Sequence, residues 1–239
     1  MSRNLVVTGA SCAIGEAVCR KIVRPGDRVL LHCFRNEERC RGLAGSLDAD
    51  CAVVAADLAD PVALASLCGR LGDAEILVHC AAVTRTGLLA HLEDADLAAM
   101  VSVNIEALVR VCRAVVPGMV ARRRGCIVNV SSVTAARGMP GQAVYAGTKG
   151  FMESFTRSLA AEYGARGIRA NCVAPGAIDA GSLKPLLAAA PQEVRGSIAL
   201  GRTGTPEDVA GMVAFLCGDE ASFISGRTFA VDGGFGRGV

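Results

Sequence analysis

Short apolar runs alternate with longer stretches of helical periodicity along the whole chain. The apolar runs are unbroken by polar residues, as expected of strands that are covered on both faces of a sheet. We predict strands at residues 5–8, 28–33, 52–55, 76–80, 126–131, 169–173 and 228–231. We predict helices at about 14–24, 37–46, 61–71, 95–119, 143–164 and 206–217.

This alternation predicts an α/β protein with a Rossmann-like, doubly wound, seven-stranded parallel sheet. A length of 239 residues suits one domain, and we expect residues 1–239 to form a single domain with this Rossmann-like fold. The least regular segment, about 178–203, follows Pro175-Gly176. It should lie at the carboxyl end of the sheet, where ligands bind, so we expect it to form a substrate lid.

Composition narrows the class of protein further. Apolar residues make up 51% of the chain and the mean hydropathy is +0.40, which fits apolar surface buried between subunits. A net charge of +2 indicates neither a nucleic-acid footprint nor a membrane anchor. No apolar run suggests a membrane span or a signal peptide, so we expect a cytoplasmic protein. The eleven cysteines include no C-x-x-C pair, and we expect reduced thiols and no metal site.

A glycine-rich turn joins the first predicted strand to the first predicted helix, at residues 8–15 (TGASCAIG). Gly9 can supply the tight turn, and Gly15 can allow the helix to pack close to the strand. The amides at the helix N-terminus would then face a pyrophosphate. A glycine pattern alone is a weak signal, and an ordinary strand–helix turn is the alternative.

The residues after the second strand bear on the choice of nicotinamide cofactor. NAD-binding sheets usually place an acid there to hold the ribose 2′-hydroxyl, but this chain has none at residues 31–36. Arg35 could instead bind the 2′-phosphate of NADPH, or it could simply begin a solvated loop. After the third strand, the Asp57 carboxylate, followed by Leu58, could accept a hydrogen bond from the adenine amino group.

The strongest chemical signal is Tyr145-x-x-x-Lys149, because a spacing of four places both side chains on one face of a helix. Free tyrosine has a pKa of about 10, and a nearby ammonium should lower it toward the range useful for proton transfer. Ser132, at the end of a predicted strand, could orient a substrate carbonyl. Asn104 could hold a water that links Lys149 to solvent.

These segments together resemble the short-chain dehydrogenase/reductase family. The resemblance also rests on Asn129-Val130-Ser131-Ser132, Asn171-x-x-Ala174-Pro175-Gly176 and Val231-Asp232-Gly233-Gly234. It implies a catalytic tetrad of Asn104, Ser132, Tyr145 and Lys149, and substrate contacts at Ser132, Gln142 and Tyr145. It implies cofactor contacts at Gly9, Ser11, Cys12, Ile14, Gly15, Arg35, Asp57, Leu58, Ala81, Tyr145, Lys149, Pro175, Gly176 and Ile178.

A narrower resemblance is to 3-oxoacyl-[acyl-carrier-protein] reductases and acetoacetyl-CoA reductases. Its segments are V-T-R-x-x-L-L at 83–89, G-Q-A-V-Y at 141–145 and R-x-G-x-P-E-D-V-A at 202–210. It implies that Arg123 and Arg166 dock an acidic acyl carrier protein, although a solvated basic surface would explain them equally well. The neighbouring Arg122, Arg124 and Arg169 favour docking, because clustered charge steers an acidic partner.

The chain departs from the family pattern at four places. Ala13 replaces the middle glycine of the turn, and Cys12 replaces the basic residue that commonly precedes it, which weakens the NADP assignment. His79-Cys80-Ala81-Ala82 replaces N-N-A-G, and we expect His79 to be structural. Ala180 replaces a threonine expected near the nicotinamide carboxamide.

We therefore expect NADPH-dependent reduction of a β-keto acyl thioester, carried by acyl carrier protein or CoA, in fatty-acid or specialised polyketide or polyene synthesis. A dehydrogenase of a free ketone or alcohol is the alternative, and a catalytically silent nucleotide-binding regulator is a third possibility. Phe151, Phe155, Leu159 and Tyr163 follow Lys149 at spacings of four. This apolar stripe predicts a homotetramer with D₂ symmetry in which such helices pair.

Overall fold

The computed structural model describes residues 2–181, 189 and 191–236. It contains one seven-stranded parallel sheet, as the sequence predicts, and the strand order is β3-β2-β1-β4-β5-β6-β7. The strands are β1 (Asn4–Thr8), β2 (Arg28–Cys33), β3 (Asp50–Ala55), β4 (Ile76–His79), β5 (Gly125–Val130), β6 (Ile168–Pro175) and β7 (Thr228–Val231). The order reverses between β1 and β4, which opens a crevice at their carboxyl ends.

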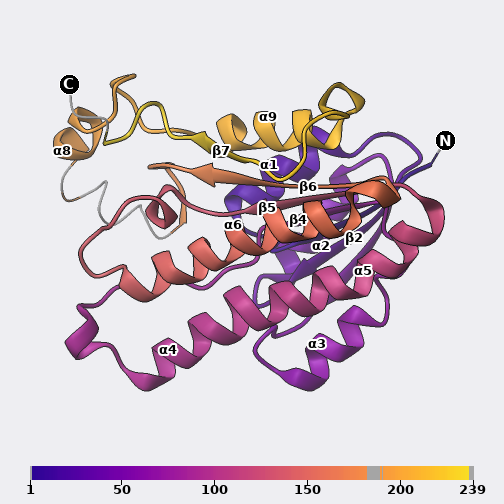
Figure 1. The fold of residues 1–239 in the computed structure, drawn as a ribbon, viewed down its shortest axis with the longest axis horizontal. Helices are drawn as coiled ribbons and strands as arrows, with labels where there is room; N and C mark the ends of the chain where they lie inside the picture. The colour runs from indigo at the N-terminus through magenta and orange to yellow at the C-terminus, as the bar shows by residue number, and fades with distance from the viewer. Residues whose placement is uncertain (1, 182–188, 190, 237–239) are drawn as a thin grey trace.

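Helices cover both faces of the sheet (Figure 1). One layer contains α1 (Ala13–Ile22), α2 (Glu37–Ser46) and α9 (Pro206–Cys217), and the other contains α3 (Pro61–Cys68), α5 (Leu108–Arg122) and α6 (Ala143–Tyr163). Two apolar cores result, one on each face. Every residue of β4 and β5 is buried, because these central strands contact both layers.

The long helix predicted at 95–119 is a composite. It consists of α4 (Asp94–Val101), a π-helical turn η2 (Ser102–Ala107) and α5. Short π segments inside helices often occur at functional sites, and this one contains Asn104. Among the described residues, 3-10 turns occur at η1 (Leu89–His91), η3 (Val133–Ala135), η4 (Gly164–Arg166) and η6 (Asp219–Ala221).

The described part of the predicted lid lies at the carboxyl end of the sheet, on the side of α8 (Figure 1). It includes a short helix that the sequence did not indicate, α8 (Pro191–Gly196), and Val194 packs with Ala177, Ile198 and Phe235. Residues 182–188 and 190 of the lid lie outside the described residues. Among the described helices, none is both long enough and apolar enough to cross a membrane.

Candidate active site

Three of the four predicted tetrad residues line one cleft at the carboxyl ends of the central strands. Tyr145 and Lys149 project from α6, and Ser132 follows β5. The cleft encloses about 420 Å³. Residues far apart in the sequence meet there because the carboxyl ends of parallel strands share one edge of the sheet.

Lys149 is buried, with 2% of its surface exposed. Its Nζ donates a 2.8 Å hydrogen bond to the carbonyl oxygen of Val130, the last residue of β5. Nζ also lies 5.7 Å from the centroid of the Tyr145 ring. Burial disfavours the ammonium and lowers the pKa of Lys149 to about 8. Lys149 can therefore change protonation state near neutral pH.

Tyr145 differs from the expectation drawn from its spacing to Lys149. Burial raises the pKa of Tyr145 above its usual value, and the hydrogen bond from Ser132 opposes the rise. Desolvation of the phenolate is the larger effect, and the Lys149 ammonium is directed toward the carbonyl oxygen of Val130. Tyr145 therefore keeps its proton at neutral pH, as a proton donor requires.

Ser132 is held by a neighbour that sequence analysis did not single out. Its Oγ accepts hydrogen bonds from the backbone amide of Thr134 at 3.3 Å and from the Thr134 hydroxyl at 3.0 Å. Because both of these bonds use its acceptor capacity, the hydroxyl proton of Ser132 remains available to Tyr145 or to a substrate oxygen. Thr134 thus orients Ser132 toward the cleft.

Asn104 is fully buried and does not line the cleft. Its side-chain amide bonds to both backbone groups of Val83, at 2.8 Å each, and its Nδ2 donates to Thr148 Oγ1 at 3.1 Å. Thr148 precedes Lys149 on α6. The side chain of Asn104 therefore joins the segment after β4 to the catalytic helix, which is a positioning role. The water-holding role expected from the sequence stays a prediction.

His79 occupies the buried end of β4. One ring nitrogen, Nδ1, lies 2.9 Å from the Thr8 hydroxyl. The other, Nε2, and Oδ1 of Asn129, its register partner on β5, have no hydrogen-bond partner among the described residues. Burial lowers the pKa of His79 to about 3, so the ring is neutral. This environment supports the structural role expected for His79.

The glycine-rich turn has the close packing that its sequence predicts. Gly9 adopts a positive φ of 68°, and a Cβ on Gly15 would lie 2.3 Å from the Gly9 carbonyl oxygen. Ala81 imposes a second constraint on the turn, because a Cβ on Gly9 would lie 2.8 Å from the amide nitrogen of Ala81. Cys12 is the N-cap of α1 and is exposed, and its Sγ accepts a 3.2 Å hydrogen bond from Gly15.

The structure brings together nine of the residues predicted for cofactor or substrate. The cleft is lined by Cys12, Ile14, Ser132, Gln142, Tyr145, Lys149, Pro175, Gly176 and Ile178. Gly9, Ser11 and Gly15 belong to the turn itself and Ala81 packs against Gly9, but none of the four lines the cleft. The glycine turn at one end and Lys149 at the other fit a dinucleotide, because the backbone can approach a pyrophosphate where a Cβ would collide.

The predicted adenosine contacts lie at the ends of β2 and β3. Arg35 is exposed, and its guanidinium lies 4.8 Å from the centroid of the Phe34 ring. Asp57 Oδ1 accepts a hydrogen bond from the Ala59 amide at 2.9 Å, and Leu58 is buried. Arg35 is thus free of a described carboxylate partner and can reach an anion in solvent.

Arg123 and Arg166 lie away from the cleft. Both are exposed at the amino ends of β5 and β6, and Arg123 Nη2 donates to the carbonyl oxygen of Ala165 at 3.2 Å. A strand of six residues such as β5 spans roughly 20 Å. The length of the sheet therefore separates these two side chains from Ser132.

The cleft also contains residues that sequence analysis missed. Met139, Thr134, Val133 and Phe235 line it, and Phe235 comes from the C-terminal segment after β7. None belongs to a motif with catalytic spacing. Turn residues and tails of this kind carry no periodic signal, so only the fold reveals their position.

The comparisons with known proteins cover nearly the whole chain. A family model described as "Enoyl-(Acyl carrier protein) reductase" matches residues 9–236. Nodulation protein G of Rhizobium meliloti is 37% identical over 236 residues, covering 97% of this chain and 96% of that protein. The 3-oxoacyl-[acyl-carrier-protein] reductase of Pseudomonas aeruginosa is 36% identical over 236 residues, covering 96% of this chain and 95% of that protein.

Solved structures agree with these sequence relatives. A 3-oxoacyl-[acyl-carrier protein] reductase from Brucella melitensis has a TM-score of 0.88 and 30% identity, covering 99% of this chain and 92% of that one. A structure described as a candidate NAD(P) dependent gluconate 5-dehydrogenase from Beutenbergia cavernae, with bound NADP at low occupancy, has a TM-score of 0.90 and 32% identity. It covers 97% of this chain and 96% of that one.

The fold and the site define an NAD(P)-dependent oxidoreductase of the Rossmann class. The chain belongs to the short-chain dehydrogenase/reductase family.

Proposed function

We propose that this protein reduces the β-keto group of an acyl thioester with NADPH as the reductant. The observation that carries the proposal is the shared cleft of Ser132, Tyr145 and Lys149, with Tyr145 protonated. The names of the curated relatives support the substrate class, since several are 3-oxoacyl-[acyl-carrier-protein] reductases.

The residues of the cleft suit this reaction. When bound, the nicotinamide supplies a hydride to the keto carbon. Tyr145 donates its proton to the carbonyl oxygen, and Ser132 orients that oxygen with a hydrogen bond. The ammonium of Lys149 stabilises the negative charge left on the Tyr145 oxygen, and it can also bind the ribose hydroxyls. Burial strengthens both interactions because few water molecules compete.

Two features favour NADPH over NADH. The segment after β2 contains no acid that would repel a 2′-phosphate, and Arg35 is exposed there as a planar cation. Two of the structural relatives were solved with bound NADP. Cys12 stands where many relatives carry a basic residue, so Arg35 would carry most of the preference for the phosphate.

A second candidate function is oxidation or reduction of a free sugar acid or small alcohol. It is favoured by the structural relatives described as gluconate dehydrogenases. The cleft argues for the acyl thioester, because Val133, Met139, Ala177 and Phe235 line it with apolar surface. A polyhydroxylated substrate would leave its hydroxyl groups without partners there.

One assay separates the candidates. NADPH oxidation would be measured with acetoacetyl-CoA, with an acetoacetyl carrier protein, with 5-ketogluconate and without any ketone. We expect turnover with the two thioesters and little with the sugar acid. Turnover only with 5-ketogluconate would support the second function, and no turnover with any ketone would support a nucleotide-binding regulator.

We further propose that Arg123 and Arg166 dock an acidic acyl carrier protein. Both side chains are exposed on a surface that also carries Arg124. Because β5 separates them from Ser132 by roughly 20 Å, a bound carrier would have to reach along the sheet or serve the cleft of another copy of the chain. Steering by such rim charges acts mainly on the association rate.

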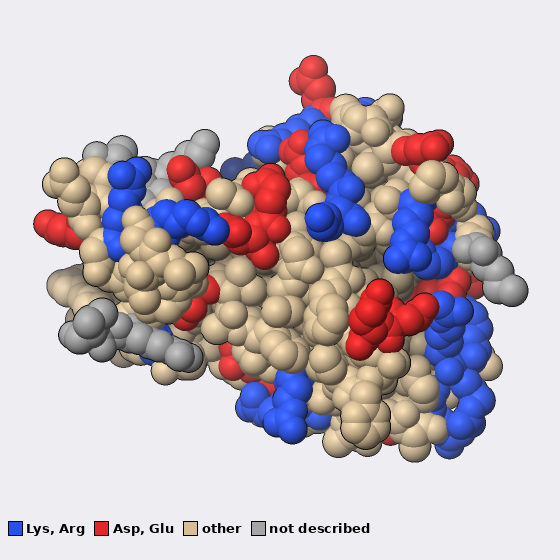
Figure 2. Space-filling model, turned by 90° about the horizontal axis from the view of Figure 1, so that it is seen from above, with Lys and Arg blue, Asp and Glu red and all other residues tan. Residues whose placement is uncertain are grey.

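We also propose that the protein assembles into a homotetramer. Phe151 of α6 is 37% exposed and stacks on Phe155 at 5.8 Å, whereas Leu159 of the same stripe is buried in the core. On the face seen in Figure 2, charged side chains surround a broad uncharged area over α9 and β7. Phe215 of α9 is 41% exposed. The exposed aromatic side chains of α6 and α9 would each lie at an interface of such a D₂ assembly.

A further inference from the structure

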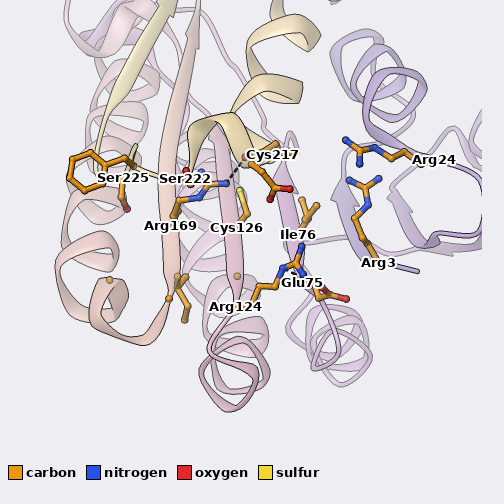
Figure 3. A pocket seen from close by; sticks show the side chains of 17 residues that line it. Arg3, Arg24, Glu75, Ile76, Arg124, Cys126, Arg169, Cys217, Ser222 and Ser225 are labelled. Carbon is orange, nitrogen blue, oxygen red and sulfur yellow. Dashed lines mark hydrogen bonds and ion pairs between the residues drawn. The ribbon is translucent and has the colours of Figure 1, made fainter. Parts of the chain in front are cut away.

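A second cavity lies at the opposite end of the sheet from the catalytic cleft (Figure 3). It encloses about 500 Å³. Its walls are the amino ends of β4, β5 and β6 and the segment that joins α9 to β7. Nothing in the proposed reaction uses this cavity.

The lining of the cavity is rich in positive charge. Four arginines from separate segments line it: Arg3, Arg24, Arg124 and Arg169 (Figure 3). The lining contains two carboxylates, Glu75 and Asp219, and Asp27 pairs with Arg3 from outside it. Four guanidinium groups therefore face three carboxylates, and the excess favours an anionic ligand.

Two cysteines line the same cavity, Cys126 near the start of β5 and Cys217 at the end of α9. Cys126 Sγ donates to the carbonyl oxygen of Leu216, the residue before Cys217, at 3.4 Å. Arg169 is the register partner of Cys126 on β6, and its Nη1 donates to the same carbonyl oxygen at 2.9 Å. One carbonyl group thus brings both cysteines and a guanidinium together.

The surroundings shift the pKa values of the two thiols in opposite directions. A hydrogen bond from Cys217 and the nearby Arg169 guanidinium lower the pKa of Cys126. The same hydrogen bond and burial raise the pKa of Cys217. Cys126 is therefore the more acidic thiol of the pair and the first to lose its proton. A low-pKa thiol next to a second thiol is the arrangement found in redox-active pairs.

We propose that this cavity is a thiol–disulfide exchange site, where Cys126 and Cys217 react with an anionic low-molecular-weight disulfide. The arginines attract the carboxylates of the small disulfide and hold it beside Cys126. The cavity shares no residue with the cleft of Tyr145, although Arg124 also belongs to the surface proposed for carrier docking.

The exchange proceeds by two successive attacks of a thiolate on a disulfide. The Cys126 thiolate attacks one sulfur of the small disulfide, forms a mixed disulfide and expels the other half as a thiolate. That thiolate takes the proton of Cys217. The Cys217 thiolate then attacks the Cys126 sulfur, closes the Cys126–Cys217 disulfide and expels the second half. Two electrons pass from the protein to the small disulfide, and a dithiol reductant reverses the reaction.

The chain contains a matched comparison in Cys33 and Cys40. Cys40 Sγ also donates to a backbone carbonyl, that of Leu31, at 3.9 Å. Neither Cys33 nor Cys40 has any exposed surface or lines the arginine-rich cavity, whereas Cys126 is 5% exposed and Cys217 is half-buried. Burial raises the pKa of both. They should remain reduced under conditions that oxidise Cys126 and Cys217.

The experiment exposes the reduced, full-length protein to two alkyl disulfides of similar size and opposite charge, 3,3′-dithiodipropionate and cystamine. Tryptic peptides 125–137 and 203–227 contain one cysteine each, so their cross-linked product reports the Cys126–Cys217 bond by mass spectrometry. We expect this product to form at least about tenfold faster with the dianion than with the dication. The ratio should fall as salt rises.

Variants make the test specific. Arg24→Ala and Arg124→Ala should reduce the preference for the dianion, whereas Arg70→Ala, an exposed arginine outside the cavity, should not. Cys217→Ser should trap the mixed disulfide on peptide 125–137. The proposal is overturned if the cross-linked product does not form, or if both disulfides produce it at the same rate.

Discussion

The ammonium of Lys149 donates a 2.8 Å hydrogen bond to the carbonyl oxygen of Val130, which ends β5. Ser132 follows two residues later, so the same strand end positions both Lys149 of α6 and Ser132, the serine proposed to orient the substrate. The bond stabilises the charged form of a buried lysine, which burial alone would neutralise. This relationship leads to the first prediction.

Replacing Tyr145 by Phe should lower turnover at least about 10²-fold, because the proton donor is lost while the ring remains. Tyr163→Phe changes the only other tyrosine and should leave turnover unchanged. Reductive kcat/KM should fall as pH rises through about 8, where Lys149 loses its proton. Lys149→Arg should move that decline to higher pH. Steady-state kinetics from pH 6 to 10 would test this, and full activity of Tyr145→Phe would refute the mechanism.

The protein should bind NADPH more tightly than NADH. Arg35→Ala should narrow the difference by about 1–3 kcal/mol, because a charge-assisted hydrogen bond to the 2′-phosphate is lost. Arg41→Ala is the control, since Arg41 pairs with Glu37 on α2. Titration of both cofactors by fluorescence or calorimetry measures the difference. A wild-type preference for NADH would contradict the assignment.

Asn104→Ala should lower the free energy of unfolding by about 2–4 kcal/mol. The substitution leaves the amide and the carbonyl of Val83 without their partner beside the cleft. Asn4→Ala removes two hydrogen bonds at an exposed site and should cost less than about 1 kcal/mol. Urea denaturation of the two variants provides the comparison, and equal costs would argue against the positioning role of Asn104.

Stability should depend on pH through His79. Its pKa is lowered to about 3 in the folded protein, whereas the unfolded chain binds a proton near pH 6.5. The unfolded state therefore gains protons first, and stability is lost as pH falls below about 6.5, by up to about 1.4 kcal/mol per pH unit.

His79→Asn should remove this part of the pH dependence, and His91→Asn, at an exposed histidine, should not. Unfolding free energies at pH 7 and pH 5 provide the measurement. A wild-type and a His79→Asn protein with the same change between these pH values would show that His79 does not contribute.

Reversing the charge of Arg123 or Arg166 should weaken the use of a carrier-bound thioester and leave the use of acetoacetyl-CoA nearly unchanged. The effect should shrink as salt rises, because exposed charges are screened. Arg70→Glu makes the same change in net charge elsewhere on the surface. Equal losses on both substrates would indicate damage to the fold, and no loss on either would indicate a solvated patch.

Local patterns determined much of the fold. The bounds of β2, β7, α2 and α9 match those predicted from the sequence, and the remaining strands differ by a few residues at their ends. Apolar runs and helical periodicity depend only on which faces of a single strand or helix are buried. They can therefore be recognised in the amino-acid sequence. The spacing of Tyr145 and Lys149 is likewise a property of one helix.

The tertiary structure decided the burial and the hydrogen bonds of Tyr145 and Lys149. Sequence spacing predicted a lowered pKa for Tyr145, but burial raises it, since the fold directs the Lys149 ammonium to Val130. Met139 reaches the cleft from a turn and Phe235 from the C-terminal segment, and neither residue belongs to a motif that would predict its position. Cys126, Arg169 and Cys217 meet at one carbonyl although 91 residues separate the two cysteines. Burial and contact depend on residues distant in sequence, and no local pattern records them.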